Sequence, residues 1–247
     1  MRNLARVTWL ALTGVVGPVA VAQADEAAVV EAEDAGWTVD VSLFVLGANM
    51  DGTIGVAGHD ADIDVSFGDI TEDLEMGAMG LVRVAHDRWA FTTELIYMGL
   101  GASAGPFGTD VDQWNIEPSA SFRVSDRFET IVGVRYTNIS AEIRGPFGRE
   151  VSGTVDWWDP IIGGRLMLPI GDGTWTFYLR GDVGGFGVGS DIAWQLFPYF
   201  GWQFGERGSM QVGYRALSMD YDEGSGASEF KYDVVTQGPQ LGVTFRF

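Results

Sequence analysis

The chain has 247 residues, 35 glycines, no cysteine and a formal net charge of −19, because 34 Asp and Glu oppose 15 Lys and Arg. Such an acidic surface excludes nucleic acid as a ready partner, and the lack of cysteine excludes a disulfide framework. Aromatic residues make up 13% of the sequence. No apolar run of about 18 residues follows the N-terminal region, which excludes a helical membrane protein.

The N-terminal 24 residues have the parts of a secretory signal peptide. Arg2 and Arg6 supply positive charge, an apolar stretch runs from Val7 to Ala22, and Ala22 to Ala24 is a small-x-small cleavage site. Glycine and proline interrupt the apolar stretch, so a membrane-spanning helix is the poorer interpretation. We therefore expect a signal peptide at 1–24 and an acidic periplasmic leader at 25–36, which shows no strand pattern.

Residues 37–247 read as a succession of strands. From Val235 to Phe247 every second residue is apolar with one exception, and the residues between are small or polar. This period of two places the two sets on opposite faces of a strand. The same pattern predicts about ten strands, with eight as an alternative, at residues 37–47, 76–85, 89–100, 111–124, 128–141, 157–168, 175–184, 191–204, 209–221 and 233–247.

The connections between these strands alternate in length. Short turns are centred on Asp87, Asp126, Asp172 and Arg207. Longer connections are expected at residues 48–75, 101–110, 142–155 and 222–231, with a short glycine turn at 185–190 as the exception. Short periplasmic turns, longer outer loops and an outward aromatic face are typical of an all-β, transmembrane, antiparallel up-and-down β-barrel of the outer membrane. A soluble sandwich would have to bury most of the tryptophans in one core.

The inward face of the predicted barrel carries charges that nearly cancel. Alternation places seven carboxylates and seven arginines inside: Asp40, Glu94, Glu117, Glu129, Asp159, Asp182 and Asp191, and Arg83, Arg123, Arg135, Arg165, Arg180, Arg215 and Arg246. Side chains fill the interior of a barrel of eight to ten strands, and a confined charge needs a hydrogen-bonded partner. We interpret the set as a salt-bridged plug, although alternation does not identify the individual pairs. The alternatives are a catalytic or an ion-conducting set.

Residues 37–247 resemble small Gram-negative outer-membrane barrels, the grouping that includes the OmpA transmembrane domain and OmpW, through the preceding signal peptide, the hairpin rhythm and the aromatic Phe247 of the closing strand. Three segments also resemble those of other exported barrel proteins: residues 158–165 (WDPIIGGR), residues 181–187 (GDVGGFG) and residues 213–215 (GYR). The resemblance implies the barrel fold and the outer membrane, and no particular activity. It also implies that the barrel assembly machinery reads Phe247 as an assembly signal, and that membrane lipid and lipopolysaccharide surround the barrel.

Catalytic and metal-binding candidates are few. Outer-membrane hydrolases need a histidine paired with a carboxylate or a serine, and the chain has only His59 and His86. His86 lies beside Asp87 in a short turn, where a solvated turn residue is the simpler interpretation. We therefore expect no enzyme and no cofactor.

Three carboxylates in the long connection at 48–75 alternate along the chain. Asp60, Asp62 and Asp64 would share one side of an extended segment, and hard oxygen ligands suit Ca²⁺ or Mg²⁺. The glycine and the terminal glutamate of an EF-hand loop are missing. The segment is therefore a weak metal candidate, and a solvated loop without a specific role is the alternative.

Three functions remain compatible with this sequence. The first is a plugged barrel with a structural or surface-interaction role. The second is a narrow channel for small solutes or hydrophobic molecules, whose inward apolar residues would be Phe44, Leu46, Phe197 and Tyr199. The third is a hydrolase with a site at the barrel rim. The sequence leaves the ligand, the surface partner and the oligomeric state open.

Overall fold

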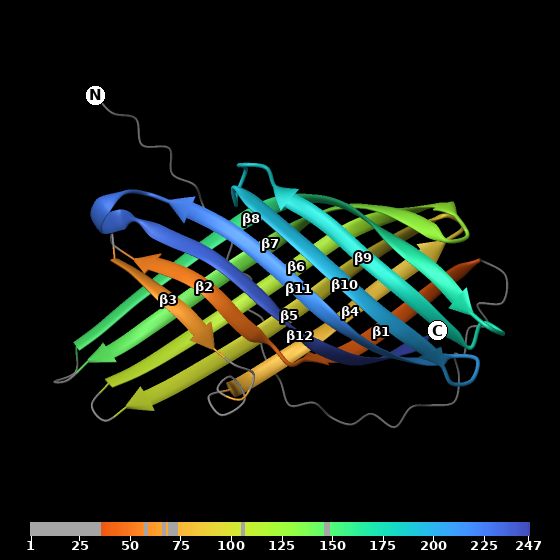
Figure 1. Cartoon of the computed structure of the whole chain (residues 1–247), viewed down its shortest axis with the longest axis horizontal. Coiled ribbons are helices and arrows are strands. Elements are labelled where there is room, and N and C mark those ends of the chain that lie inside the picture. The colour runs from red at the N-terminus through yellow and green to blue at the C-terminus, as the bar shows by residue number, and fades with distance from the viewer. Residues whose placement is uncertain (1–35, 57–58, 66–67, 69–73, 105–106, 146–148) are drawn as a thin grey trace, which may run out of the picture. The chain divides into compact units, whose positions relative to one another are not determined.

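A computed structural model of the chain describes residues 36–56, 59–65, 68, 74–104, 107–145 and 149–247 (Figure 1). The predicted signal peptide at 1–24 and nearly all of the predicted leader at 25–36 lie outside these residues. Among the residues described, no helix is long and apolar enough to cross a membrane.

The described residues form a single antiparallel sheet, and ten of its strands close into a barrel. The ring runs β1-β4-β5-β6-β7-β8-β9-β10-β11-β12, and β12 pairs back onto β1. The strands are β1 (Trp37–Leu46), β2 (Asn49–Val56), β3 (His59–Val65), β4 (Leu74–His86), β5 (Trp89–Ala104), β6 (Phe107–Ser125), β7 (Phe128–Gly145), β8 (Arg149–Ile170), β9 (Trp175–Gly185), β10 (Ile192–Gln203), β11 (Gly208–Glu223) and β12 (Phe230–Arg246). The prediction of a ten-strand antiparallel barrel is confirmed.

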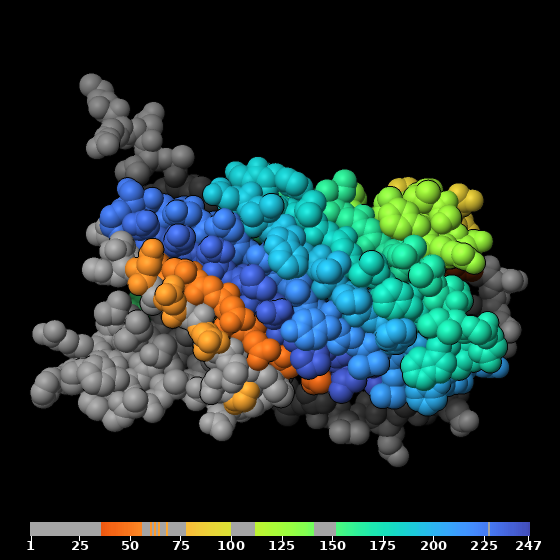
Figure 2. Space-filling view, in the orientation of Figure 1, coloured from red at the N-terminus to blue at the C-terminus, as the bar shows by residue number. Residues whose placement is uncertain are grey.

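Strands β1 and β2 lie end to end along a single partner, β12. The C-terminal half of β12 pairs with β1, and its N-terminal half pairs with β2, so that the side chains of β2 and β12 lie next to each other (Figure 2). At the break between β1 and β2, Gly238 passes so close to Gly47 that a Cβ at Gly238 would lie 1.8 Å from the Gly47 carbonyl oxygen. Only glycine fits there. Strand β3 then pairs with β2 as a hairpin outside the ring.

The connections at 48–75, 101–110 and 142–155 were wrongly predicted as loops, because most of their described residues are strand, whereas the loop predicted at 222–231 is present at 224–229. Strands β2 and β3 lie within the expected loop at 48–75, and β8 is 22 residues long. At 222–231 a short 3-10 turn, Gly226–Ser228, separates β11 from β12. Beyond the membrane-spanning segments the outward face need not be apolar, so these parts of the chain lack clear alternation although their backbones stay paired.

The outer surface of the ring is an apolar belt bordered by aromatic side chains. Near the short turns, Trp89 is 53% exposed. Farther along β5, Tyr97 packs on Trp114 with ring centroids 4.4 Å apart, and the two strands beyond hold the corresponding pair of Tyr136 and Trp158. The segment of β5 between these borders matches the roughly nine to eleven residues of a tilted transmembrane strand.

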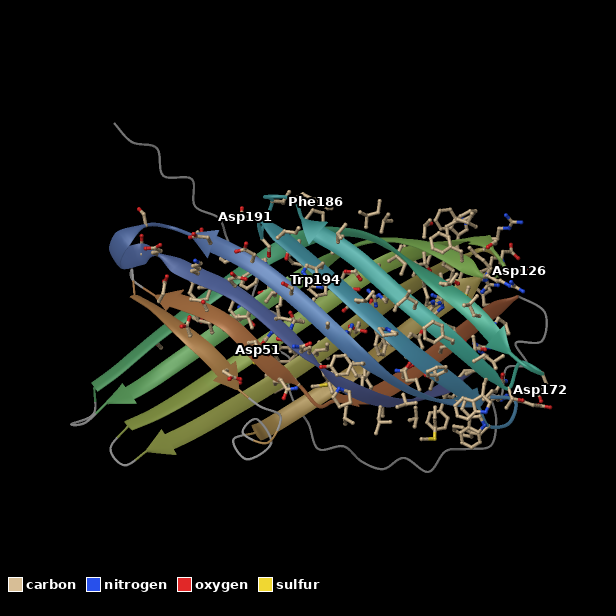
Figure 3. All side chains as sticks on the ribbon, in the orientation of Figure 1. Asp51, Asp126, Asp172, Phe186, Asp191 and Trp194 are labelled. Carbon is tan, nitrogen blue, oxygen red and sulfur yellow. The ribbon has the colours of Figure 1, made fainter. Side chains whose placement is uncertain are left out.

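The first residues of β1 and the last residues of β12 meet at the end of the barrel that carries the short turns, which we call the short-turn end. Figure 3 shows Asp126 and Asp172 there, and Asp51 far from them along the barrel. The backbone N–H of Phe247 donates to the Val39 carbonyl oxygen at 2.9 Å, and the Val39 N–H donates to the Phe247 carbonyl oxygen at 3.2 Å. The last residue of the sequence therefore completes the ladder that closes the ring.

We predict that assembly of the barrel requires the aromatic ring of Phe247 in addition to its backbone hydrogen bonds. Deleting Phe247 removes both hydrogen bonds and the aromatic group, whereas Phe247→Ala removes the aromatic group alone. If assembly reads the aromatic ring, both variants will yield less heat-modifiable barrel in the outer membrane, and Phe247→Tyr will match the wild type. Wild-type amounts of folded Phe247→Ala would show that the ring is not an assembly signal.

Candidate functional site

The lumen consists of three successive layers, which can be followed along single strands. Inward positions of β7 run from Glu129 near the short turns through Arg135 to Ile139, and all three are buried. We call the first layer the vestibule, the second the central ion network and the third the apolar layer. Each layer draws on strands from opposite sides of the ring, so only barrel closure brings its members together.

The central ion network consists of Glu94, Glu117, Arg135, Arg180, Asp182 and Arg215. Arg135 donates from Nε and Nη2 to Oε2 of Glu117 at 2.9 and 2.7 Å, and from Nη2 to Oδ1 of Asp182 at 2.8 Å. Arg180 also pairs with both carboxylates. Three guanidinium groups thus meet three carboxylates, which is the arrangement that a confined lumen tolerates.

Arg215 ties the network to the wall on the opposite side. Its guanidinium pairs with Glu94 and donates from Nε to Oε1 of Gln195 at 2.9 Å, and Gln195 in turn donates to Oδ2 of Asp182 at 3.0 Å. The same guanidinium lies over the rings of Phe44 and Phe197, 5.9 and 5.6 Å from their centroids. These aromatic side chains therefore pack on the network and do not line an open path.

The vestibule is a cavity of about 310 Å³ at the short-turn end. Its charged walls are Asp40, Arg83, Arg123, Glu129, Arg165 and Arg246, with Glu206 and Arg207 at its rim. Glu129 accepts from Arg83 at 2.9 Å and from Arg165 at 2.7 Å, and Arg123 lies 3.6 Å away. Asp40 accepts two bonds from Arg246, at 2.7 and 3.1 Å.

Two residues that the sequence analysis assigned to the charge network, Asp191 and Asp159, do not take part in its ion pairs. Asp191 is exposed, so its inward assignment was wrong, because the strand alternation of β10 begins only at Ile192. Asp159 is fully buried but has no ion pair among the described side chains; it accepts from Ser190 N at 2.7 Å, Ser190 Oγ at 2.8 Å and Trp157 Nε1 at 3.1 Å. It anchors the turn between β9 and β10.

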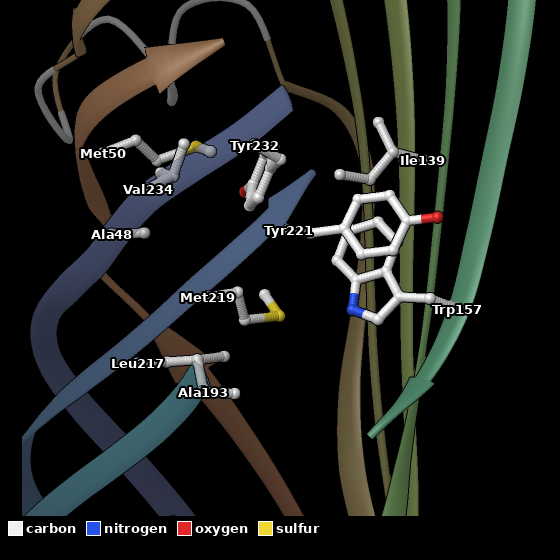
Figure 4. Close-up of a cluster of buried hydrophobic side chains, with 10 residues drawn as sticks. All are labelled: Ala48, Met50, Ile139, Trp157, Ala193, Leu217, Met219, Tyr221, Tyr232 and Val234. Carbon is white, nitrogen blue, oxygen red and sulfur yellow. The ribbon is translucent and has the colours of Figure 1, made fainter. Parts of the chain in front are cut away.

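The apolar layer closes the lumen beyond the network. Its centre is a stack of Trp157 on Tyr221, with ring centroids 4.2 Å apart and an interplanar angle of 13° (Figure 4). The buried side chains of this layer are Ala48, Met50, Ile139, Trp157, Ala193, Leu217, Met219, Tyr221, Tyr232 and Val234. The sequence analysis missed this layer, although the alternation that places Asp159 inside places Trp157 inside as well.

The remaining candidates lie on the outside of the barrel. Asp60, Asp62 and Asp64 share one exposed face of β3, and Asp62 accepts from Thr53 Oγ1 at 3.2 Å. Over the part of the chain that the structure describes, no three His, Cys, Asp or Glu side chains are placed to share a metal ion. His86 stacks on Trp37 with centroids 4.5 Å apart; the side chain of His59 lies outside what is described.

A closed ring with an apolar, aromatic outer belt and a charged lumen defines the protein as a transmembrane β-barrel of the outer membrane. No family model matches the chain, and no curated protein matches it.

Among solved structures, the chain is similar to Ail, the attachment invasion locus protein of Yersinia pestis, at 11% identity over 86% of this chain and 99% of that chain, with a TM-score of 0.43. It is also similar to the outer membrane protease OmpT from Escherichia coli, at 10% identity over 85% and 96% of the two chains, with a TM-score of 0.44. Neither likeness is close enough to carry an argument about activity.

We predict that the network stabilises the fold as a unit. Arg135→Met leaves Glu117 and Asp182 short of a partner in a closed space, which should lower the free energy of unfolding by about 3–5 kcal/mol. Asp191→Asn, a charge removed from the exposed surface, should change it by less than about 0.5 kcal/mol. Urea unfolding in lipid vesicles measures both. Equal stability of the Arg135→Met barrel and the wild type would show that water enters this layer.

Proposed function

We propose that the protein is a plugged, non-conducting barrel with a structural or surface-interaction role. The observation that carries this proposal is the closure of the lumen by two consecutive layers. The central ion network is neutral and hydrogen-bonded, and the apolar layer beyond it stacks Trp157 on Tyr221. A hydrated solute would have to displace both layers to cross the barrel, so the function is left to the surfaces that solvent reaches without crossing them.

The second function in this proposal, surface interaction, is supported by the outer surface of the barrel beyond the aromatic border formed by Tyr97, Trp114, Tyr136 and Trp158. There the outward positions of neighbouring strands are acidic: Asp220 is paired across strands with Asp233, and Asp51 with Asp64. Burial, together with the nearby Asp233, raises the pKa of Asp220. We propose that this face shares the divalent cations that bridge lipopolysaccharide, in keeping with the resemblance to barrels of the OmpA and OmpW grouping.

Of the other functions, a narrow channel has one observation in its favour. The vestibule opens the lumen from the short-turn end as far as Tyr178 and Tyr199, so rearrangement of the two layers beyond it would complete a pore. For an enzyme the structure offers less, because His86 lies 3.5 Å from the exposed Asp87 and stacks on Trp37 at the membrane border. We therefore propose a non-enzymatic role.

Planar-bilayer recording tests the plug. We expect no steady conductance steps above baseline from the wild-type protein. Its folded state is verified by heat-modifiability of the same preparation before it is added to the bilayer. Steady single-channel steps from that preparation would contradict the plug and support the channel. In that case Arg135→Met should alter conductance or ion preference.

Orientation can be tested with single cysteines, because the chain has none of its own. Ser225→Cys lies between β11 and β12, and Asp126→Cys lies in the short turn between β6 and β7; both positions are exposed. With the short turns in the periplasm, a membrane-impermeant maleimide added to intact cells should label the first variant only. Labelling of Asp126→Cys alone would reverse the orientation.

A further inference from the structure

The positive charge of the lumen is distributed unevenly between its layers. In the central ion network the three arginines and three carboxylates cancel. In the vestibule four arginines, Arg83, Arg123, Arg165 and Arg246, face only Asp40 and Glu129, while Arg207 and Glu206 at the rim offset one another. A protein with a net charge of −19 therefore has an excess of two positive charges in one cavity.

Glu129 illustrates the shortage of acceptors in this cavity. One of its oxygens accepts from Arg83 and the other from Arg165. Arg123, at 3.6 Å, is beyond a normal hydrogen bond to the same carboxylate. The Nε atom of Arg165 is buried and has no hydrogen-bond partner within the described residues. Arg83 also donates from Nη1 to Ser121 Oγ at 3.2 Å. Because each guanidinium offers five donors, Glu129 and Ser121 together accept from only a minority of the donors of these three arginines.

The other walls suit a small polar molecule. The hydroxyl-bearing residues Thr174, Thr176 and Ser209 line the cavity, and so do Tyr178 and Tyr199, whose rings stack with centroids 4.7 Å apart. A volume of about 310 Å³ is at the lower end of ligand-binding pockets in general, about 300–1,000 Å³. The cavity therefore has room for an anion with a few attached atoms and is too small for a folded partner.

We propose that the vestibule binds a small soluble anion of the phosphate class, which enters from the short-turn end. A guanidinium presents a planar fork that matches phosphate oxygens in a bidentate manner. A phosphate monoester carries about −1.5 to −2 charges at pH 7, which neutralises the excess of two positive charges. The proposal does not depend on whether the lumen conducts, since the vestibule is open in either case.

Binding is measured by isothermal titration of inorganic phosphate and glycerol 3-phosphate into the full barrel in an uncharged detergent at low salt. We expect saturable one-site binding that weakens as sodium chloride is added. Arg123→Gln and Arg165→Gln should each weaken binding about ten-fold, the loss expected for a hydrogen bond to a charged group. Arg127→Gln serves as the matched control: it removes the same charge from an exposed position in the neighbouring turn, outside the cavity, and should leave affinity unchanged.

A gain of affinity provides a second test that a purely structural role would not predict. Asp40→Asn removes the carboxylate that occupies Arg246, so phosphate should bind several-fold more tightly. Arg123 is 45% exposed, so Arg123→Gln remains informative if Arg165→Gln does not fold. Absence of saturable binding to the wild type, or equal loss in Arg127→Gln and Arg123→Gln, would overturn the proposal. Binding only of phosphatidylglycerol in nanodiscs would overturn the soluble source and assign the phosphate to a lipid headgroup.

Discussion

The pairing of β1 with β12 is the constraint on which the rest of the structure depends. In lipid there is no water to satisfy a free strand edge, so a spanning sheet must close upon itself. The ladder from Asp40 opposite Arg246 to Leu46 opposite Gln240 provides that closure. Closure also fixes the width of the lumen, and a lumen of ten strands is narrow enough for side chains to fill.

Confinement then determines how the lumen can be occupied. At mid-height the polar side chains have no bulk water nearby, and three arginines paired with three carboxylates fill the space with no net charge. On the side of the network away from the short turns, the apolar layer fills the lumen, with Trp157 stacked on Tyr221 at its centre. At the short-turn end solvent reaches the cavity, and only there does the positive charge exceed the negative charge. The charge imbalance thus coincides with the part of the lumen in which it costs least.

Much of this architecture could be predicted from alternation. The hairpin rhythm predicted ten strands, and the outward position of residues such as Trp89 and Trp158 follows from period two alone. Prediction failed where the outward environment changes from lipid to water. In the extensions of β5 to β8 neither face is required to be apolar, so the pattern lapses although the backbones remain paired. At Asp191 the error came from extending the alternation of β10 one residue before the strand begins.

What the sequence determined by itself is which face of each strand a side chain occupies, because successive residues of a strand point to opposite sides. It therefore placed Arg135, Glu117 and Asp182 inside the barrel. Only the tertiary structure decided their partners. Arg135 stands opposite Asp159 in the register of β7 and β8, yet it pairs with Glu117 and Asp182, while Asp159 holds Ser190. A long guanidinium side chain reaches beyond its nearest neighbour in the sheet, so the pairing depends on which strands the closed ring brings within its reach.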